Sequence, residues 1–474
     1  MEDFLSFLRI RSVSQEGPTT GAYREAVQFL RALVERRLRP LRSDLEIYEE
    51  EFVASKPVLL VHIPSRQDAT QPVDPDSTPN YTDAILLNSH YDVVPAMREH
   101  WSTDPFAPEM RKDRIYARGT QDMKCVCIQY VLALERALSK TPSFRRPVWL
   151  SFVPDEEIGG KDGMCAMLNS ALWRDRLEGR VALALDEGLA NESEKNFTVF
   201  FGERNPWWIM VRAEGPTGHG SRFIQDTAVS KIIKVANKAL EFRRAEEERL
   251  LYHKNATAFM NSGEAEQPAC GCKHSLAKKL GDVTTVNLTA LQAGVFNETT
   301  KTYALNVIPV EATAGFDVRI SPLFKVADFR ALLDSWVAEF NGSVTWSFAP
   351  GTVPSEKHFL TPVRSRPEYF VCDPVTDILT GESGERNVKS STAWWDLFAE
   401  AMQEFGYGLD AEVFPAATDS RFLRQLKIPA FGFSPMRNCA IMLHEHNEYI
   451  PVETFWEGVD VYEKLLPRLF ASTI

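Results

Sequence analysis

The feature that most constrains this chain is residues 84–92, AILLNSHYD, where four apolar residues run into a polar end. This pattern predicts a strand buried on both faces, which is typical of the centre of a parallel sheet. The strand delivers His90 and Asp92 to its carboxyl end, the edge where ligands bind in open α/β sheets. Residues two apart on a strand share a face, so the carboxylate can fix the tautomer of a metal-binding imidazole. Taken alone, the pair is more simply a strand-end histidine and a turn aspartate.

Two further apolar segments, 147–153 and 181–185, repeat this arrangement, and Asp122 begins a predicted buried helix over 123–138. The acidic residues that follow the two segments are Asp155, Glu156, Glu157, Asp186 and Glu187. Several anions on one sheet edge repel one another unless a cation lies among them. Carboxylate and imidazole ligands suit zinc, and two metals about 3.5–4 Å apart are typical of aminopeptidase-type hydrolytic sites. The repetition therefore predicts a metal site at this edge.

Each acidic feature also has a simpler interpretation. Asp122 is a good helix N-cap, and the pair Glu156 and Glu157 can be the acidic first turn of a helix behind Pro154. We favour the metal interpretation because His90 and Asp122 lie upstream of that pair, and all of these residues are expected at one edge of the sheet.

Composition limits the function classes. At 474 residues the chain exceeds one comfortable core, which favours two domains. A net charge of −12 and a pI near 5.4 argue against nucleic acid and anionic membranes as partners. No run of 18 apolar residues occurs, and acids stand where a signal peptide would carry bases, so we expect a cytoplasmic protein. Seven scattered cysteines fit free thiols better than a disulfide framework.

Residues 198–350 read as a separate α+β domain inserted into an α/β domain formed by 1–197 and 351–474. The insert is expected to pack two helices on about four antiparallel strands. The predicted helices are 226–250 and 326–340, and the strands are 207–211, 283–291, 310–320 and 343–348. Residues 254–281 look like an irregular surface insertion, in which Cys270, Cys272 and His274 are a weak metal set because a fourth ligand is missing. Residues 351–392 are expected to form an extended loop.

The chain resembles zinc-dependent aminoacylases of the family that includes di-zinc carboxypeptidases, acetylornithine deacetylase and succinyl-diaminopimelate desuccinylase. The matching segments are NSHYDVVP (88–95), ARGTQDMK (117–124), DEE (155–157), LDEG (185–188) and the His444-x-x-Asn447-Glu448 motif. The segments NPWW (205–208) and FGFSPM (431–436) resemble the aminoacylase branch. The similarity runs from about residue 4 to 470, and the chain departs from the pattern by insertions at 254–281 and 355–390.

The resemblance implies a fold and a set of roles. The fold is a catalytic α/β domain of the di-zinc peptidase type, with a mainly parallel central sheet and an inserted α+β lid and dimerisation domain. The implied ligands of one zinc are His90, Asp122 and Glu187, and those of the second are Asp122, Glu157 and His444. Asp92 is expected to orient His90 and Glu156 to be the general base, while His219, Asn306 and Arg319 match the family's lid residues. A histidine or amide donor can stabilise an oxyanion, and the arginine fork suits a substrate carboxylate.

The expected activity is hydrolysis of N-acyl L-amino acids to the free amino acid and a carboxylate, in a homodimer with two Zn²⁺ per chain. The inserted domain need not overhang its own zinc site, so a partner chain is expected to supply His219. A dipeptidase or carboxypeptidase of the same family shares all the metal ligands and stays open. A metal-free binding or scaffold protein is less consistent, since every motif position carries a competent residue.

Overall fold

The computed structural model of the chain describes all residues except 66–83, 262–278, 351, 353, 363–364 and 368–392, and leaves aside the side chains of 252–261. Its larger sheet has nine strands in the order β1-β2-β6-β3-β7-β19-β8-β17, with β18 paired to β8. The strands are β1 (Glu46–Val53), β2 (Lys56–Ile63), β3 (Ala84–His90), β6 (Val148–Val153), β7 (Val181–Asp186), β8 (Asn196–Glu203), β17 (Phe359–Leu360), β18 (Gly408–Phe414) and β19 (Ala430–Gly432). Strand β3 lies between β6 and β7 and is parallel to both, which confirms the predicted parallel core.

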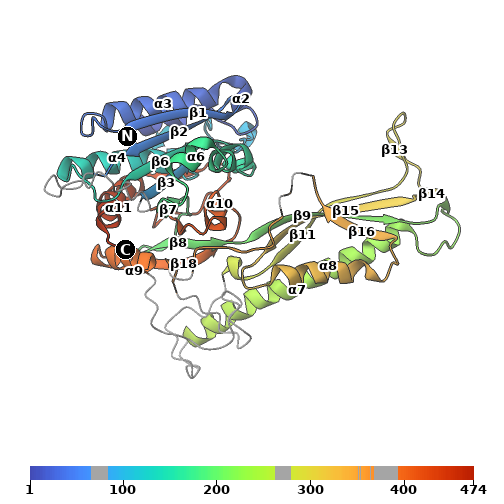
Figure 1. Ribbon diagram of the computed structural model, residues 1–474. Helices are drawn as coiled ribbons and strands as arrows, with labels where there is room; N and C mark the ends of the chain where they lie inside the picture. The colour runs from blue at the N-terminus through green and yellow to red at the C-terminus, as the bar shows by residue number, and fades with distance from the viewer. Residues whose placement is uncertain (66–83, 262–278, 351, 353, 363–364, 368–392) are drawn as a thin grey trace.

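Helices cover both faces of this sheet (Figure 1). One face packs against α1 (Glu2–Leu8), α3 (Ala22–Arg37), α4 (Lys124–Lys140), α9 (Ala393–Glu404) and α11 (Val452–Ala471). The other face packs against α5 (Ala166–Leu168), α6 (Ala171–Arg176) and α10 (Ser420–Gln425). Strand β3 serves both cores by alternation, because Ile85 and Leu87 face the first and Leu86 faces the second. A strand with two covered faces reads as a continuous apolar run, as the sequence does.

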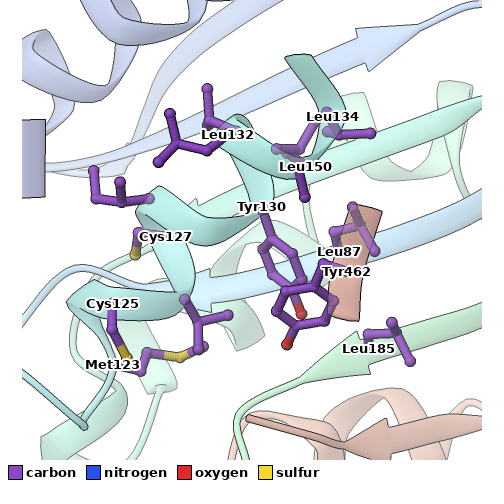
Figure 2. Packing of buried hydrophobic residues seen from close by; sticks show 14 of the residues in the cluster. Leu87, Met123, Cys125, Cys127, Tyr130, Leu132, Leu134, Leu150, Leu185 and Tyr462 are labelled. Atoms are coloured by element: carbon purple, nitrogen blue, oxygen red, sulfur yellow. The ribbon is translucent and has the colours of Figure 1, made fainter. Parts of the chain in front are cut away.

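Helix α4 anchors the centre of the first core (Figure 2). Its Tyr130 packs beside Tyr462 of α11, with ring centroids 4.7 Å apart, and Leu87 of β3 and Leu185 of β7 lie in the same cluster. Full burial of one such leucine side chain contributes about 1.5–3 kcal/mol to the stability of the fold. The helix is therefore fixed firmly on the sheet. The loop that precedes α4 is thereby held at the carboxyl ends of the parallel strands.

The second unit is a four-stranded antiparallel sheet, β11-β15-β9-β16, packed on two helices as predicted. It extends as an arm from the α/β unit, and β14 lies at its far end (Figure 1). Its elements are β9 (Asn205–Glu214), α7 (Ala228–Asn261), β11 (Thr285–Ala293), β15 (Glu311–Ile320), α8 (Val326–Ala338) and β16 (Val344–Phe348). The chain passes from the larger sheet to this one at Arg204, between the end of β8 and the start of β9.

Short elements complete the described chain. They are α2 (Gly17–Thr20), β4 (Glu109–Arg111), β5 (Arg114–Tyr116), β10 (Gly218–His219), β12 (Phe296–Asn297), β13 (Thr302–Tyr303), β14 (Val307–Ile308) and β20 (Tyr449–Pro451), with the single turns η2 (Arg98–His100), η3 (Glu156–Ile158), η4 (Lys161–Cys165) and η5 (Leu280–Asp282). In the part of the chain that the structure describes, no helix combines the length and the apolar character needed to cross a membrane.

Two local features of the structure differ from the predictions. Helix α7 continues to Asn261, past the predicted start of the insertion at 254. Strand β18 was not predicted. The Cys270–His274 segment lies outside the described residues, as does most of the extended loop predicted at 351–392, of which Phe359 and Leu360 form β17.

Candidate metal centre

Three neighbouring strands release chemically active side chains at one edge of the larger sheet. Strand β3 ends at His90, which is in register with Val153 at the end of β6. The chain then turns through η3, which carries Glu156 and Glu157, and β7 ends one residue before Glu187. Because these strands are parallel, their carboxyl ends meet at one place, and the predicted convergence of the acidic residues is confirmed.

The first ligand cluster is buried and consists of His90, Asp122 and Glu187. The Nε2 atom of His90 lies 3.1 Å from Asp122 Oδ1 and 3.6 Å from Glu187 Oε2. One ligand atom from each residue lies within 4.8 Å of the others, which is the spacing that ligands of a single ion require.

The second cluster shares Asp122 with the first and adds Glu157 and His444. His444 Nε2 lies 2.9 Å from Glu157 Oε2 and 3.3 Å from Asp122 Oδ2. The two oxygens of Asp122 therefore face different histidines, as expected of a carboxylate between two ions. His444 is half exposed and has a φ of 60°, a strained conformation for a residue that is not glycine. Its neighbour His446 stays outside the cluster and packs against His100.

Asp92 stands behind the cluster and joins two of its parts. Its main-chain carbonyl lies 3.0 Å and its Oδ1 3.4 Å from Nδ1 of His90, so both groups face the ring nitrogen that is turned away from the cluster. Its carboxylate also accepts hydrogen bonds from the backbone N–H groups of Glu156 and Glu157 and from the Ser14 hydroxyl. One buried aspartate thus orients the imidazole and the turn that carries the two glutamates.

Asp122 is held by a loop that a distant residue organises. Helix α4 has Met123 at its N-cap position without a side-chain cap bond, so the simpler interpretation of Asp122 as a helix cap is wrong. Glu448 is fully buried and accepts hydrogen bonds from the N–H groups of Gly119 and Gln121, at 3.0 and 2.7 Å. Thr120 and Arg118 donate further bonds to the same carboxylate.

Burial and mutual repulsion shift the pKa values of the clustered groups. Burial raises the pKa of Glu187 and of Glu156 well above the usual range, and the charge of Glu187 adds to the shift at Glu156. Burial, and next the charge of Asp122, raise the pKa of Glu157 to about 7. Hydrogen bonds to Asp122 and Glu157 raise the pKa of His444 to about 10. Such a set of oxygen and imidazole donors fits divalent metal ions, whose charge stabilises ionised carboxylates that would otherwise repel one another.

Three expected site residues lie away from this cluster. His219 on β10 is exposed, and its Nδ1 lies 2.7 Å from Ser221 Oγ. Asn306 is near it, because its carbonyl accepts a hydrogen bond from Gly220 N–H. Strand β10 pairs with β14, at the far end of the arm (Figure 1). Arg319 lies at the opposite end of the arm's sheet, in register with Pro206 beside the passage between the two units, and forms a two-pronged ion pair with Asp317.

Sequence reasoning missed three residues around the site, namely Glu448 as an organiser, Asp419 and Arg421. Asp419 is fully buried, and its two carboxylate oxygens have no hydrogen-bond partner among the described residues. Burial, and next the charge of Asp186, raise its pKa well above the usual range. No local pattern could reveal these roles, because the contacts join segments that are hundreds of positions apart.

The fold and the two clusters define a class of hydrolase whose His and carboxylate groups could hold metal ions. Residues 86–468 match Peptidase family M20/M25/M40, and the chain belongs to this family. It is 36% identical over 468 residues to Aminoacylase-1 of Dictyostelium discoideum, covering 98% of this chain and 96% of that protein.

Two solved structures share the fold. An M20 family metallo-carboxypeptidase from Sulfolobus solfataricus superimposes with a TM-score of 0.63 at 18% identity, covering 98% of each chain. A dinuclear metal-binding M20 peptidase from Bacillus subtilis gives 0.56 at 13% identity, covering 98% of this chain and 96% of that one.

Proposed function

We propose that the chain is a zinc-dependent amidohydrolase that converts N-acyl L-amino acids and water into free amino acids and carboxylates. The observation that carries the proposal is the pair of His and carboxylate clusters that share Asp122. His90, Asp122 and Glu187 would hold one Zn²⁺, and Asp122, Glu157 and His444 the other. The similarity to Aminoacylase-1 over nearly the whole chain supports the substrate class.

Bound metal ions supply Lewis acidity, which polarises the scissile carbonyl and makes water acidic enough to react at neutral pH. The protein supplies proton transfer. Glu156 is buried beside both clusters, and its carboxylate forms no hydrogen bond or ion pair with a described residue, so it can accept a proton from the attacking water. The proton then passes to the departing nitrogen as the C–N bond breaks, which regenerates the carboxylate. Glu157, by contrast, is committed to His444 and to the N–H of Val94.

Arg319 is proposed to bind the free α-carboxylate of the substrate. Burial, and next the positive charge of Arg319, lower the pKa of Arg204 to about 10, which indicates two neighbouring guanidinium groups. Asp317 neutralises one of these charges, and an incoming carboxylate would neutralise the other. Arg204 and Arg319 lie where the chain passes from the larger sheet to the arm.

His219 is proposed to act across a homodimer. It lies with Asn306 at the far end of the arm, exposed and apart from the cluster formed by its own chain. Mixing inactive His219→Ala chains with inactive Glu156→Gln chains tests this assignment. In a shared-site dimer, one site of each mixed pair combines an intact Glu156 with an intact His219, so activity returns on subunit exchange. Mixed dimers that form and stay inactive would show that the histidine acts within its own chain.

We also propose that the protein works in the cytoplasm. The four described cysteines that remain free thiols, Cys125, Cys127, Cys165 and Cys439, support a reducing compartment.

A dipeptidase of the same family is the alternative, because it needs the same metal ligands. The two activities separate when turnover of N-acetyl-methionine is measured beside a panel of dipeptides with the same enzyme and metal. We expect kcat/KM for the N-acetyl substrate to exceed that of each dipeptide. Preference for the dipeptides would replace the proposed substrate class while leaving the metal centre intact.

A further inference from the structure

The turn that carries Glu156 and Glu157 ends in two glycines, and this glycine end rests against the start of helix α10. Arg421 of this helix donates from Nη2 to the carbonyl of Gly159 at 2.7 Å. Its Nη1 donates to the carbonyl of Thr418 at 2.9 Å. The side chain is 9% exposed and forms no ion pair within the described residues. Burying a guanidinium costs free energy, and here two backbone carbonyls are its hydrogen-bond acceptors. This arrangement suggests that fixing these carbonyls has a function.

Asp419 supports the same turn from beside the arginine. A Cβ added at Gly160 would lie 2.2 Å from Asp419 Oδ1, so the carboxylate packs directly on that glycine. Gly160 also has a φ of 62°. A side chain at this position would therefore displace Asp419 or the turn, and the positive φ also favours glycine.

The start of α10, which carries Asp419 and Arg421, is itself fixed at the junction between the two units. Thr418 donates its N–H and its hydroxyl to the buried carboxylate of Glu203, at 3.1 and 2.8 Å. Glu203 is the last residue of β8 and also pairs with Arg424 at 2.8 Å. The start of α10 is thus fixed from behind and can hold the glycine turn in place.

The two glutamates of the turn depend on this support to different extents. Glu157 is fixed through its side chain by His444 and Val94. Within the described part of the chain, Glu156 is fixed only through its backbone, where its N–H donates to Asp92 and its carbonyl accepts from Gly159 N–H at 2.8 Å. Gly159 therefore bonds to Glu156 through its N–H and to Arg421 through its carbonyl. Loosening Gly159 should move the Glu156 carboxylate more than the metal ligands.

We propose that Arg421 is a positioning residue for Glu156, acting through Gly159, with Asp419 as the second support of the turn. The inference rests on the proposed role of Glu156 as general base. A misplacement of about 1 Å can reduce turnover by roughly 10²-fold. Removing Arg421 should therefore lower kcat by about this factor while the metal content and KM stay close to those of the wild type.

The test compares Arg421→Ala with Arg174→Ala, in which the lost arginine donates to the carbonyl of Asn169 at 2.8 Å on an exposed surface. Each variant is made in the wild type and in a Glu156→Asp background, whose carboxylate is already displaced. We expect Arg421→Ala to lower kcat strongly in the wild type and several-fold less in the Glu156→Asp background, and Arg174→Ala to change neither. Equal losses in both backgrounds, or a kcat like that of the control, would overturn the inference.

Gly160→Ala provides an independent variant if Arg421→Ala does not fold. It pushes the turn from the side of Asp419 and leaves the arginine in place, so it should give the same loss of kcat with retained metal. Glu156→Gln distinguishes a failure of the proposed function from a failure of the positioning role. If Glu156→Gln keeps full activity, the proposed function is wrong. If Glu156→Gln is inactive while Gly160→Ala and Arg421→Ala keep wild-type kcat, only the positioning role fails.

Discussion

Replacing Glu448 by alanine should weaken the fold and the metal centre together. The carboxylate is fully buried and accepts bonds from two backbone N–H groups, the Thr120 hydroxyl and the Arg118 guanidinium. Arg118 also donates to the carbonyl of His444 at 3.3 Å. Glu448 therefore connects the loop that ends in Asp122 with the loop that bears His444, one ligand from each side of the second cluster.

The size of the effect follows from what the substitution leaves behind. Breaking one partner of a buried ion pair typically costs about 3–5 kcal/mol, because the other charge stays buried and unpaired. Here the stranded cation is Arg118, whose side chain is 3% exposed, and two backbone donors lose their acceptor as well. We expect a loss of about 3–5 kcal/mol in the free energy of unfolding. Residues that orient metal ligands typically change metal affinity by about 10–100-fold, so the affinity of the second site should fall by that factor.

Urea denaturation of the metal-stripped protein measures the first quantity, and competition with a chelator measures the second. Glu448→Gln is the matched control, because it keeps the shape and one acceptor oxygen and should lose less of both. If Glu448→Ala unfolds within about 1 kcal/mol of the wild type and binds metal equally well, the carboxylate does not organise the centre as argued here.

Two further predictions concern single residues. Burial lowers the pKa of Lys124 to about 7, against about 10.4 in an unfolded chain, so the unfolded chain binds more protons between these values. The free energy of unfolding of the metal-stripped wild type should therefore rise, relative to that of Lys124→Met, as the pH is raised from about 7 to about 9.5. If the urea midpoints of the two proteins differ by the same amount at both pH values, this prediction is wrong. If Arg319 binds the substrate carboxylate, esterifying that carboxylate should cost the wild type ~1.5–3 kcal/mol in kcat/KM and cost Arg319→Ala little, whereas equal penalties would remove this role.

Much of the α/β core could be predicted because its signals are local. A strand buried on both faces must be apolar throughout, and the polar residue that follows it marks the sheet edge, as at His90 and Glu187. Asp122 follows from the same logic at the start of a buried helix. His444 carries a weaker signal. It follows a predicted strand but lies on a loop, and its role as a ligand came from the family resemblance.

The organising residues could not be predicted, because their contacts are remote in sequence. Glu448 lies 329 positions from Gly119, and Arg421 lies 262 from Gly159. Strand β18 was missed for a different reason. Most of its residues are only partly buried at the side of the larger sheet, so its sequence lacks the apolar run that reveals β3. Only the folded chain shows which of the many buried polar residues meet.

The most direct test of the whole account is to measure bound metal and turnover together in Glu156→Gln. The substitution keeps the size of the side chain and removes only its ability to accept a proton. We expect about two zinc ions per chain, as in the wild type, with kcat for an N-acyl amino acid lower by roughly 10²–10⁴-fold. Loss of zinc in this variant would make Glu156 a ligand rather than the base, and wild-type turnover with both ions bound would contradict the mechanism itself.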